Sequence, residues 1–302
     1  MIKTHPKAFI LFILVVAFTS ISKGAIATKH NLKNSAHLRD TIHFNDKTSN
    51  TLKISSWNIR DLGRTKDDKE LLEIANIIKE FDLVAIQEVV AKDPAGAQAV
   101  AKIADELNRM GFKWDYRISN PTKSPSVYIS ERYAFLWKTS KVNLIGRTYL
   151  DSELEDTIHR EPYIGKFHIK NETQPFYAIN FHSRKHNDNP EDEIIFFKEY
   201  TKRLHSDHIV ILGDFNLSET HDVWNNFYNT GYKSALKNTK TTLKIKCRYG
   251  NYLNHPIDNI YYAKGITAID SGSKDFVGSC DNLEASRTLS DHLPVFLEFK
   301  NQ

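Results

Sequence analysis

Short apolar runs recur along the chain, and most of them stop at a polar residue that can bind a metal ion or a phosphate. Residues 209–212 (IVIL) are four apolar residues in succession, three of them β-branched, which predicts a strand buried on both faces. Asp214 and Asn216 follow at a spacing of two, so on an extended backbone their side chains point to the same side. An ordinary Asx turn after the strand is the alternative, because Asp and Asn are common turn residues.

Seven other apolar runs are typical of strands. They span residues 52–59, 83–86, 133–137, 163–169, 176–181, 257–262 and 295–299. Four stretches have apolar residues at helical spacing, namely 71–81, 95–110, 191–204 and 223–228. Gly111 and Gly231 follow the second and the fourth, where glycine suits a helix end. This mixture predicts one α+β domain, in which two packed mixed sheets are flanked by helices.

The first 27 residues have the order of a secretory signal peptide: Lys3 and Lys7, then the apolar run 8–18, then small residues up to Ala27. A membrane anchor is the alternative, but a bilayer-spanning helix needs about 20 apolar residues and this run is shorter. We therefore expect a secreted or periplasmic protein, cleaved between residues 24 and 27, with no stable membrane anchoring afterwards. Residues 28–50 are polar and predict a linker, and residues 51–302 form the expected domain.

Composition adds little about function. The hydrophobic content of 40% and the aromatic content of 11% are those of an ordinary globular protein, and the four tryptophans are expected in the core. The formal net charge of +4 falls to +1 without the first 27 residues, so charge alone does not argue for a nucleic-acid partner. Cys247 and Cys280 are the only cysteines. They pair if the compartment is oxidising, and two free thiols are the alternative.

The polar residues near the ends of the apolar runs form a set suited to one reaction. The set is Asn58, Glu88, Glu131, Arg160, His182, Asp214, Asn216, Asp258, Asp291 and His292. Loops at one edge of a sheet gather residues that are distant in sequence. Carboxylates offer hard oxygen ligands for Mg²⁺, arginine neutralises charge on phosphate, and a histidine oriented by a carboxylate can deprotonate water. The set therefore indicates metal-assisted phosphodiester hydrolysis.

The motifs WNIR, QEV, ERY, REP, NFH, GDFN and SDHLPV, read in that order, resemble the endonuclease/exonuclease/phosphatase superfamily, and most of all its deoxyribonuclease I-like branch. The resemblance covers residues 52–300. It implies a four-layer α/β sandwich and a monomeric, secreted endonuclease that hydrolyses DNA with little sequence preference. It also implies Mg²⁺ as cofactor, with Mn²⁺ as a substitute and room for a structural Ca²⁺.

The resemblance also assigns roles to single residues. Asn58, Glu88 and Asp291 match the metal-binding positions. Two catalytic histidines match His182, supported by Glu131, and His292, supported by Asp258. Asp214 and Asn216 match the pair that contacts the scissile phosphate and the water or metal. Arg160 matches a phosphate-binding arginine, with a structural ion pair to Glu131 as the alternative, and Arg60 matches a DNA-contacting position.

The chain departs from the family pattern at two DNA-contacting positions. An arginine of the family is replaced by Val90, and a tyrosine by Ile129, with Tyr128 adjacent. Residues 239–254 are longer than expected and interleave cations with aromatics, so we expect this loop to contact nucleic acid in compensation; a solvated hairpin is the alternative. Two other functions stay open: a phosphohydrolase of phospholipid or phosphoinositide head groups, and a catalytically silent binding protein.

Overall fold

The eight predicted strands become the interior strands of two six-stranded sheets in the computed structural model, which describes residues 51–302. The predicted signal peptide and linker therefore lie outside the described residues. In spatial order the first sheet contains β13 (Ile266–Ser273), β14 (Val295–Asn301), β1 (Leu52–Leu62), β2 (Leu83–Val90), β4 (Glu131–Lys138) and β3 (Trp114–Ile118). The second contains β5 (Val142–Leu150), β6 (Tyr163–Ile169), β7 (Pro175–His182), β8 (Ile209–Asp214), β12 (Asp258–Tyr262) and β9 (Lys233–Ser234).

Both sheets are mixed, because each contains one parallel pair. Strands β1 and β2 are parallel in the first sheet, as are β7 and β8 in the second, and the other neighbours are antiparallel. The parallel pairs matter for the site, because the carboxyl ends of both strands of a pair lie at the same edge of the sheet. His182 is thus in register with Asp214 at the ends of β7 and β8.

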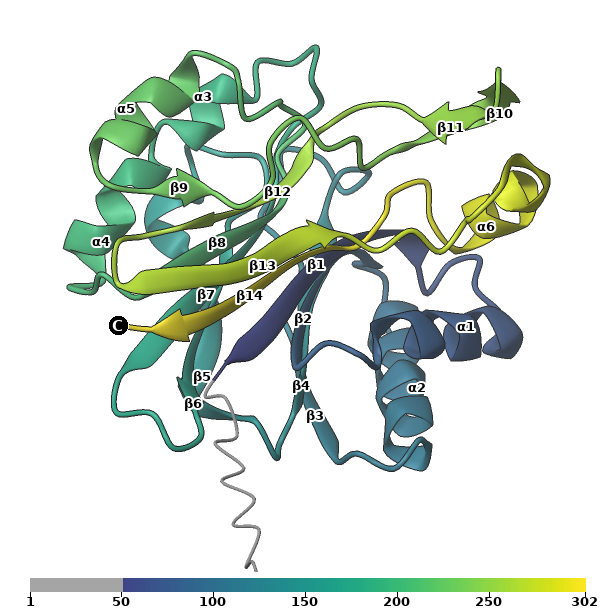
Figure 1. Ribbon diagram of the computed structural model, residues 1–302, viewed down its shortest axis with the longest axis horizontal. Helices are drawn as coiled ribbons and strands as arrows, with labels where there is room; N and C mark the ends of the chain where they lie inside the picture. The colour runs from purple at the N-terminus through teal and green to yellow at the C-terminus, as the bar shows by residue number, and fades with distance from the viewer. Residues whose placement is uncertain (1–50) are drawn as a thin grey trace, which may run out of the picture. The chain divides into compact units, whose positions relative to one another are not determined.

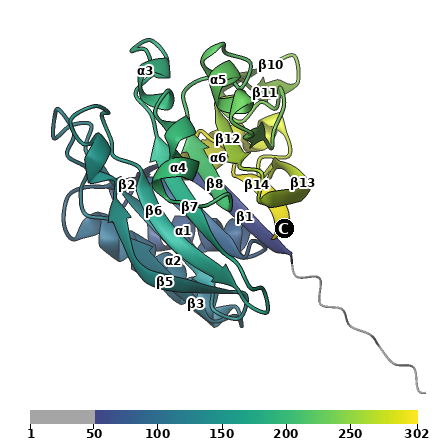
Figure 2. The same ribbon diagram turned by 90° about the vertical axis from the view of Figure 1, so that its left-hand side faces the viewer.

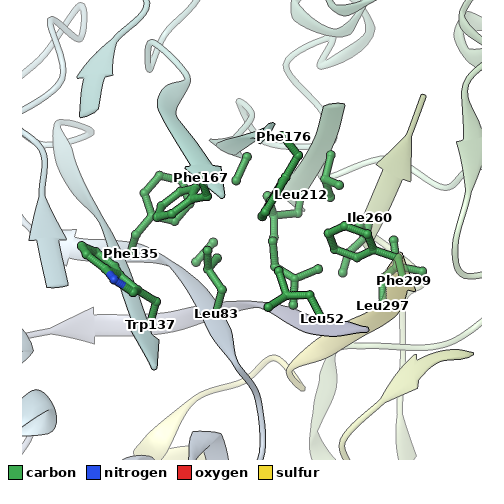
Figure 3. Packing of buried hydrophobic residues seen from close by; sticks show 14 of the residues in the cluster. Leu52, Leu83, Phe135, Trp137, Phe167, Phe176, Leu212, Ile260, Leu297 and Phe299 are labelled. Carbon is green, nitrogen blue, oxygen red and sulfur yellow. The ribbon is translucent and has the colours of Figure 1, made fainter. Parts of the chain in front are cut away.

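The two sheets pack face to face around a core of large side chains (Figure 3). Leu52, Leu83 and Phe135 from the first sheet meet Phe167 and Leu212 from the second, and all five are fully buried. Burial of one such side chain contributes on the order of 1.5–3 kcal/mol. These contacts hold the ends of both sheets at a fixed separation, which is what the site between them requires.

Helices cover the outer face of each sheet, so that the structure has the predicted four layers (Figures 1 and 2). Helices α1 (Asp68–Ile78) and α2 (Ala95–Arg109) pack on the first sheet, and α3 (Glu191–Ile194), α4 (Tyr200–Arg203) and α5 (Val223–Asn229) lie on the second. Asp67 and Glu70 form a capping box at the start of α1. Three 3₁₀ segments, η1 (Ser152–Leu154), η2 (Phe197–Glu199) and η3 (Cys280–Asn282), complete the set with α6 (Leu283–Leu289).

The predicted helix over residues 191–204 is not continuous. It is divided into α3, η2 and α4. The buried residues Ile194, Phe197 and Tyr200 recur every three residues, which is the period of a 3₁₀ turn and not of an α-helix. Ile195, expected on the apolar face, is 47% exposed. The tertiary packing of the three buried side chains therefore overrides the helical pattern.

The strands that the sequence pattern did not predict are the four sheet edges, β13, β3, β5 and β9. An edge strand pairs on one side only and keeps much of its length in water, so it lacks a long apolar run. Residues 239–254 contain a hairpin of β10 (Leu243–Arg248) and β11 (Asn251–Leu253), the form that was the alternative expectation for this segment. The four tryptophans are buried, as predicted. Within residues 51–302, none of the helices has the length and apolarity needed to cross a membrane.

Candidate active site

The candidate catalytic residues continue the inner faces of the strands beyond the apolar core. Along β8 the inner face reads Val210, Leu212, Asp214, and along β7 it leads from Ala178 to His182. Because alternate residues of a strand share a face, the polar side chains at the strand ends point into the gap between the two sheets. Asn58, Glu131 and Asp258 hold equivalent positions on β1, β4 and β12. The fold therefore gathers the predicted set at one end of the sandwich.

Asp214 lies at the centre of this group and is 2% exposed. Its Oδ2 atom accepts a hydrogen bond of 3.1 Å from Asn58 Nδ2. The same oxygen lies 3.6 Å from His182 Nε2 and 3.7 Å from His292 Nε2. Its Oδ1 atom accepts a 2.9 Å hydrogen bond from the backbone N–H of Asn216. Two imidazoles from distant parts of the sequence thus converge on one carboxylate oxygen.

Each imidazole is held from behind by a second carboxylate. His182 Nδ1 is 2.9 Å from Glu131 Oε2, and His292 Nδ1 is 2.9 Å from Asp258 Oδ2. Such a contact orients the ring and fixes which nitrogen carries the proton. The two predicted histidine–carboxylate pairs are therefore formed, and both present Nε2 to the same point.

The neighbouring carboxylates raise the pKa of both histidines. Burial alone lowers the pKa of His182, but the Glu131 carboxylate outweighs burial and the repulsion from Arg160. Burial also lowers the pKa of His292, but Asp258 and Asp214 together raise it to about 10. The pKa of Glu131 lies below its usual value, because His182 and Arg160 outweigh the effect of burial. Each imidazole therefore holds its proton more tightly than a free histidine does.

Glu88 reaches this group only because the strand is irregular. Leu83, Ala85 and Gln87 face the second sheet, so regular alternation would turn Glu88 toward the helices. The register between β2 and β4 shifts between Ile86 and Val89, and Glu88 has a left-handed φ of 59°. A bulge of this kind redirects a side chain. Glu88 Oε1 accepts a 3.0 Å hydrogen bond from Asn58, and Oε2 accepts one from the Asp61 N–H.

The donor atoms around Asn58 fit a divalent cation. Its Oδ1 atom is buried and has no hydrogen-bond partner among the described residues, while the adjacent Glu88 and Asp214 supply carboxylate oxygens. An unpaired buried acceptor beside two carboxylates is a hard-oxygen environment of the kind that Mg²⁺ takes. A second group, Asp214, Asp258 and His292, has ligand atoms within 4.8 Å of one another.

Asp291, the third predicted metal ligand, lies on the segment that precedes β14. Its Oδ2 atom is 3.9 Å from Arg60 Nη1 and 3.7 Å from Arg287 Nη2. Arg60, predicted to contact DNA, keeps 52% of its side chain exposed. Two arginines therefore hold the Asp291 carboxylate at the rim of the site, and one of them faces solvent.

Arg160, predicted to bind phosphate, is largely engaged with the protein. Its Nε atom is 3.1 Å from Glu131 Oε2, and its Nη1 atom donates to the carbonyl oxygens of His182 and Ser183 at 3.2 and 2.7 Å. The side chain is 9% exposed. The structure thus shows the ion pair that was the alternative interpretation, with a guanidinium that fixes Glu131 and the end of β7.

Asn216 stands just after β8, and its backbone has a left-handed φ of 49°. Asparagine tolerates this conformation better than most residues. The turn brings its N–H onto Asp214 and its Nδ2 atom to 3.5 Å from the Ser183 carbonyl oxygen. Both the strand end and the Asx turn predicted for this segment are present together.

Several supporting residues carried no signal in the sequence pattern. Thr241 Oγ1 donates a 2.6 Å hydrogen bond to Asp258, and the Tyr133 hydroxyl accepts from the His182 N–H. The Ser290 hydroxyl donates to the Asn58 carbonyl oxygen at 2.6 Å. Ser290 belongs to the SDH motif, so a role in the site could have been suspected from the sequence. Thr241 stands alone, 17 residues before its partner Asp258, and no sequence signal marks it.

A cleft of about 640 Å³ opens beside the site. Glu88, Glu131, Arg160 and His182 line its inner end, and its outer walls include the exposed Tyr128 and the cations Arg64, Lys92 and Lys185. Val90 and Ile129, which replace an arginine and a tyrosine of the resembled family, also line it. The lining also includes Asp61 and Asp93, and Arg64 is paired with Asp61 at 3.0 Å, so the cleft gives access to His182 and Glu88 without a clear excess of either charge.

Cys247 and Cys280 form a disulfide, with their Cα atoms 5.7 Å apart. Of the two alternatives that the sequence allowed, the paired one holds. The bond joins the β10–β11 hairpin to the segment that leads into α6.

Comparison with known proteins agrees with this geometry. Residues 55–292 match the Endonuclease/Exonuclease/phosphatase family. The chain belongs to this family. Members of the endonuclease/exonuclease/phosphatase family are hydrolases of phosphodiesters or phosphate esters and depend on divalent metal ions. The matched range contains every candidate catalytic and metal-binding residue.

Curated relatives of this family member include deoxyribonucleases. A deoxyribonuclease of Thioalkalivibrio sp. (strain K90mix) is 28% identical over 271 residues, covering 82% of this chain and 71% of the relative. Deoxyribonuclease-1 of Mus musculus is 30% identical over 176 residues, covering 55% of this chain and 60% of the relative.

Solved structures show the same fold at lower identity. An endonuclease/exonuclease/phosphatase from Bacteroides vulgatus has a TM-score of 0.60 and 16% identity, covering 83% of this chain and 99% of the other. A mannosyl-6-phosphatase of Bacteroides thetaiotaomicron has a TM-score of 0.59 and 16% identity, covering 82% and 99%. These likenesses establish the four-layer fold.

Proposed function

We propose that this protein is an exported, divalent-metal-dependent endonuclease that hydrolyses phosphodiester bonds of DNA with little sequence preference. The observation that carries the proposal is the convergence of His182 Nε2 and His292 Nε2 on Asp214, at 3.6 and 3.7 Å from the same oxygen. Hydrolysis of a phosphodiester needs one proton acceptor and one proton donor on opposite sides of phosphorus. Two imidazoles whose Nε2 atoms converge on one carboxylate oxygen supply that pair.

The proton transfers follow from this arrangement. One imidazole, in the form that has lost its Nε2 proton, accepts a proton from the attacking water as the water oxygen bonds to phosphorus. The other imidazole donates its Nε2 proton to the leaving oxygen as the P–O bond breaks, and a phosphomonoester and an alcohol result. Positioned acid–base groups of this kind typically contribute about 10²–10⁴-fold in rate. Glu131 and Asp258 keep each ring oriented through Nδ1.

A divalent cation would be held by Glu88 and by the unpaired Oδ1 atom of Asn58, with Asp291 as the third predicted ligand. When bound, it would neutralise negative charge that develops on the phosphate oxygens. Mg²⁺ is the ion we expect, with Mn²⁺ as a substitute. Arg160 acts as a positioning residue for Glu131 in this proposal, because its guanidinium hydrogen bonds go largely to protein atoms.

DNA is the proposed substrate because the curated relatives are deoxyribonucleases. Export is proposed from the signal-like residues 1–27, and the Cys247–Cys280 disulfide supports it, because disulfides persist mainly in oxidising compartments.

The test is a plasmid-nicking assay on the purified chain with Mg²⁺, Mn²⁺, Ca²⁺ or EDTA. We expect nicking with Mg²⁺, its loss in EDTA, and a loss of at least about 10²-fold in His182→Ala and His292→Ala. His168→Ala is the matched control. His168 pairs with Pro175 at the opposite end of β7 from His182, so its variant should keep the rate of the parent.

Parallel reactions use RNA, a phosphoinositide and sphingomyelin as substrates. Release of lipid phosphate without plasmid nicking would replace the nuclease by the lipid phosphohydrolase. Nicking that survives in both histidine variants would remove the two imidazoles from the mechanism.

A further inference from the structure

The segment 239–254 is a hairpin arm that extends from the edge of the site. Strands β10 and β11 pair only with each other among the described residues, and the arm projects beyond the two sheets beside α6 (Figure 1). At its tip Tyr249 is fully exposed, and on β10 Ile245 is 81% exposed. Both side chains are therefore accessible to a ligand that reaches the arm.

The charge of the arm contrasts with that of the domain. Residues 51–302 contain 34 Lys or Arg and 35 Asp or Glu, whereas the arm has four cations and no acid. Three of the cations, Lys244, Lys246 and Arg248, lie on β10. None of the three forms an ion pair within residues 51–302. Their charges are therefore available to a polyanion.

The base of the arm is bonded directly to the catalytic segment. The Leu243 N–H donates to the Asp291 carbonyl oxygen at 2.7 Å, and Thr242 forms a β-bridge with His292. Arg287 Nη1 donates to the Leu243 carbonyl oxygen at 2.7 Å. Lys244, the first cation on β10, is thus two residues from Thr242, which pairs with the catalytic His292. This side of the site lies outside the cleft beside His182.

The arm is also held in place covalently. Cys247 lies next to Lys246 and Arg248, and its disulfide to Cys280 ties the outer half of β10 to the segment before α6. Leu243 and Leu283 pack in a small apolar cluster between the arm and α6. A hairpin of two strands is marginally stable by itself, so these contacts keep the arm extended in one orientation before any ligand binds.

We propose that residues 239–254 form a DNA-binding arm, in which Lys244, Lys246 and Arg248 contact successive backbone phosphates and Tyr249 contacts the sugar or base at the far end. This inference rests on the proposed nuclease function and names a second part of its substrate surface. At about 3.3 Å per residue β10 is about 17–20 Å long, which corresponds to about five or six base pairs of duplex. DNA bound across Asp214 thus contacts the cleft on one side and the arm on the other.

The test measures binding without cleavage, by fluorescence anisotropy of a labelled 20-base-pair duplex in EDTA at several salt concentrations. The arm variant carries Lys244→Glu, Lys246→Glu and Arg248→Glu. The matched control carries Lys141→Glu, Lys170→Glu and Lys300→Glu, three exposed lysines. Lys141 follows β4, Lys170 follows β6 and Lys300 lies near the end of β14, in each case at the end of the strand that is away from the catalytic residues. Both variants change the net charge equally, so a difference between them reports the position of the charge.

We expect the arm variant to bind at least about tenfold more weakly at 0.1 M salt. We also expect it to lower the slope of log K against log salt by about one for each phosphate that the arm no longer neutralises, hence by about two to three. The control variant should keep most of the parent slope. Hydrolysis of bis(p-nitrophenyl) phosphate should be equal in all three proteins, because this small diester does not reach the arm. Cleavage of DNA should show a higher KM in the arm variant.

Equal binding by the arm variant and the parent, in a parent that nicks plasmid, overturns the arm and leaves the nuclease intact. Equal losses of affinity in the arm and control variants overturn it too, because they show an effect of overall charge. A parent that hydrolyses the small diester but neither binds nor nicks DNA refutes the proposed substrate, and the arm with it. Tyr249→Ala adds an independent measurement: it should weaken binding without changing the salt slope.

Discussion

The two sheets are joined by a buried polar contact directly beneath the catalytic residues, and its removal gives a quantitative test. Gln87 Nε2 donates to Asn180 Oδ1 at 2.6 Å and to the Ser56 hydroxyl at 3.0 Å. Asn180 Nδ2 donates to the carbonyl oxygens of Ile86 and Ala134 at 3.0 and 3.3 Å. Gln87 and Asn180 are fully buried. Glu88 is the residue after Gln87, and His182 stands two residues after Asn180.

Asn180→Leu is expected to destabilise the domain by about 2–4 kcal/mol. It removes three buried hydrogen bonds, each of net value about 0.5–1.5 kcal/mol, and leaves donor or acceptor groups of Gln87 and β4 without partners. For a domain of this size about 1 kcal/mol shifts Tm by about 2–4 °C, so Tm should fall by about 5–15 °C. Gln87→Leu should cost less, because Gln87 Oε1 already lacks a partner among the described residues.

The double variant Gln87→Leu with Asn180→Leu should recover part of this stability. Replacing both partners by apolar groups removes the unsatisfied atoms together. The destabilisation of the double variant should therefore be about 1–3 kcal/mol smaller than the sum of the two single destabilisations. Activity should not recover in the same way. A displacement of about 1 Å between catalytic groups can lower the rate by about 10²-fold, and the contact sets the position of Glu88 relative to His182.

The assay pairs urea unfolding, followed by tryptophan fluorescence, with the rate of bis(p-nitrophenyl) phosphate hydrolysis. Two results would contradict this prediction: the two single destabilisations add within about 0.5 kcal/mol, or the double variant regains the parent rate along with its stability. The first result would mean that the two side chains do not act as one contact. The second would mean that the contact stabilises the sandwich without positioning the site.

Three further predictions follow from single features of the structure. Gly213→Ala should destabilise the domain by about 1–3 kcal/mol and lower the hydrolysis rate, because an added Cβ would overlap the backbone carbonyl of the neighbouring strand β7; an unchanged thermal melt would contradict this. Asp258→Asn should lower the pKa of His292 in an NMR titration in EDTA. In the parent the pKa of His292 is raised to about 10. The stability that protonated His292 contributes is therefore complete below about pH 6.5 and is lost as the pH rises toward 10. Urea unfolding should show this decline in the parent and less of it in the variant. The double variant Cys247→Ser with Cys280→Ser should lower the free energy of unfolding by about 3–4 kcal/mol, because the disulfide closes a loop with a sequence separation of 33 residues. Urea unfolding of the parent in reductant should show the same loss.

The interior strands of the fold could be predicted from local patterns in the chain. Strands paired on both sides must bury nearly every residue, so β1, β2, β4 and β8 carry apolar runs that can be seen without a structure. The site residues were also visible, because Asp214, His182 and Asp258 interrupt such runs at points where apolar side chains would be expected. The motifs that contain them carried the resemblance to the family, and the comparisons confirmed that family.

Features that depend on contacts between distant segments could not be predicted from these patterns. The edge strands β3, β5, β9 and β13 owe their form to a single neighbour and have no strong pattern of their own. The segment 191–204 broke into short turns because three buried side chains fixed its period. Glu88 entered the site through a bulge against β4, which nothing in its local sequence requires. Arg160 found hydrogen-bond partners on two separate segments, around Glu131 and around Ser183.

The physical reason for this division is the range of the interactions. Burial of an apolar run and the alternation of a strand act between residues close in sequence, so they leave a periodic record in the chain. The convergence of His182 and His292 on Asp214 is set by the packing of two sheets against each other. That packing sums many contacts between residues far apart, and no segment of the chain contains it.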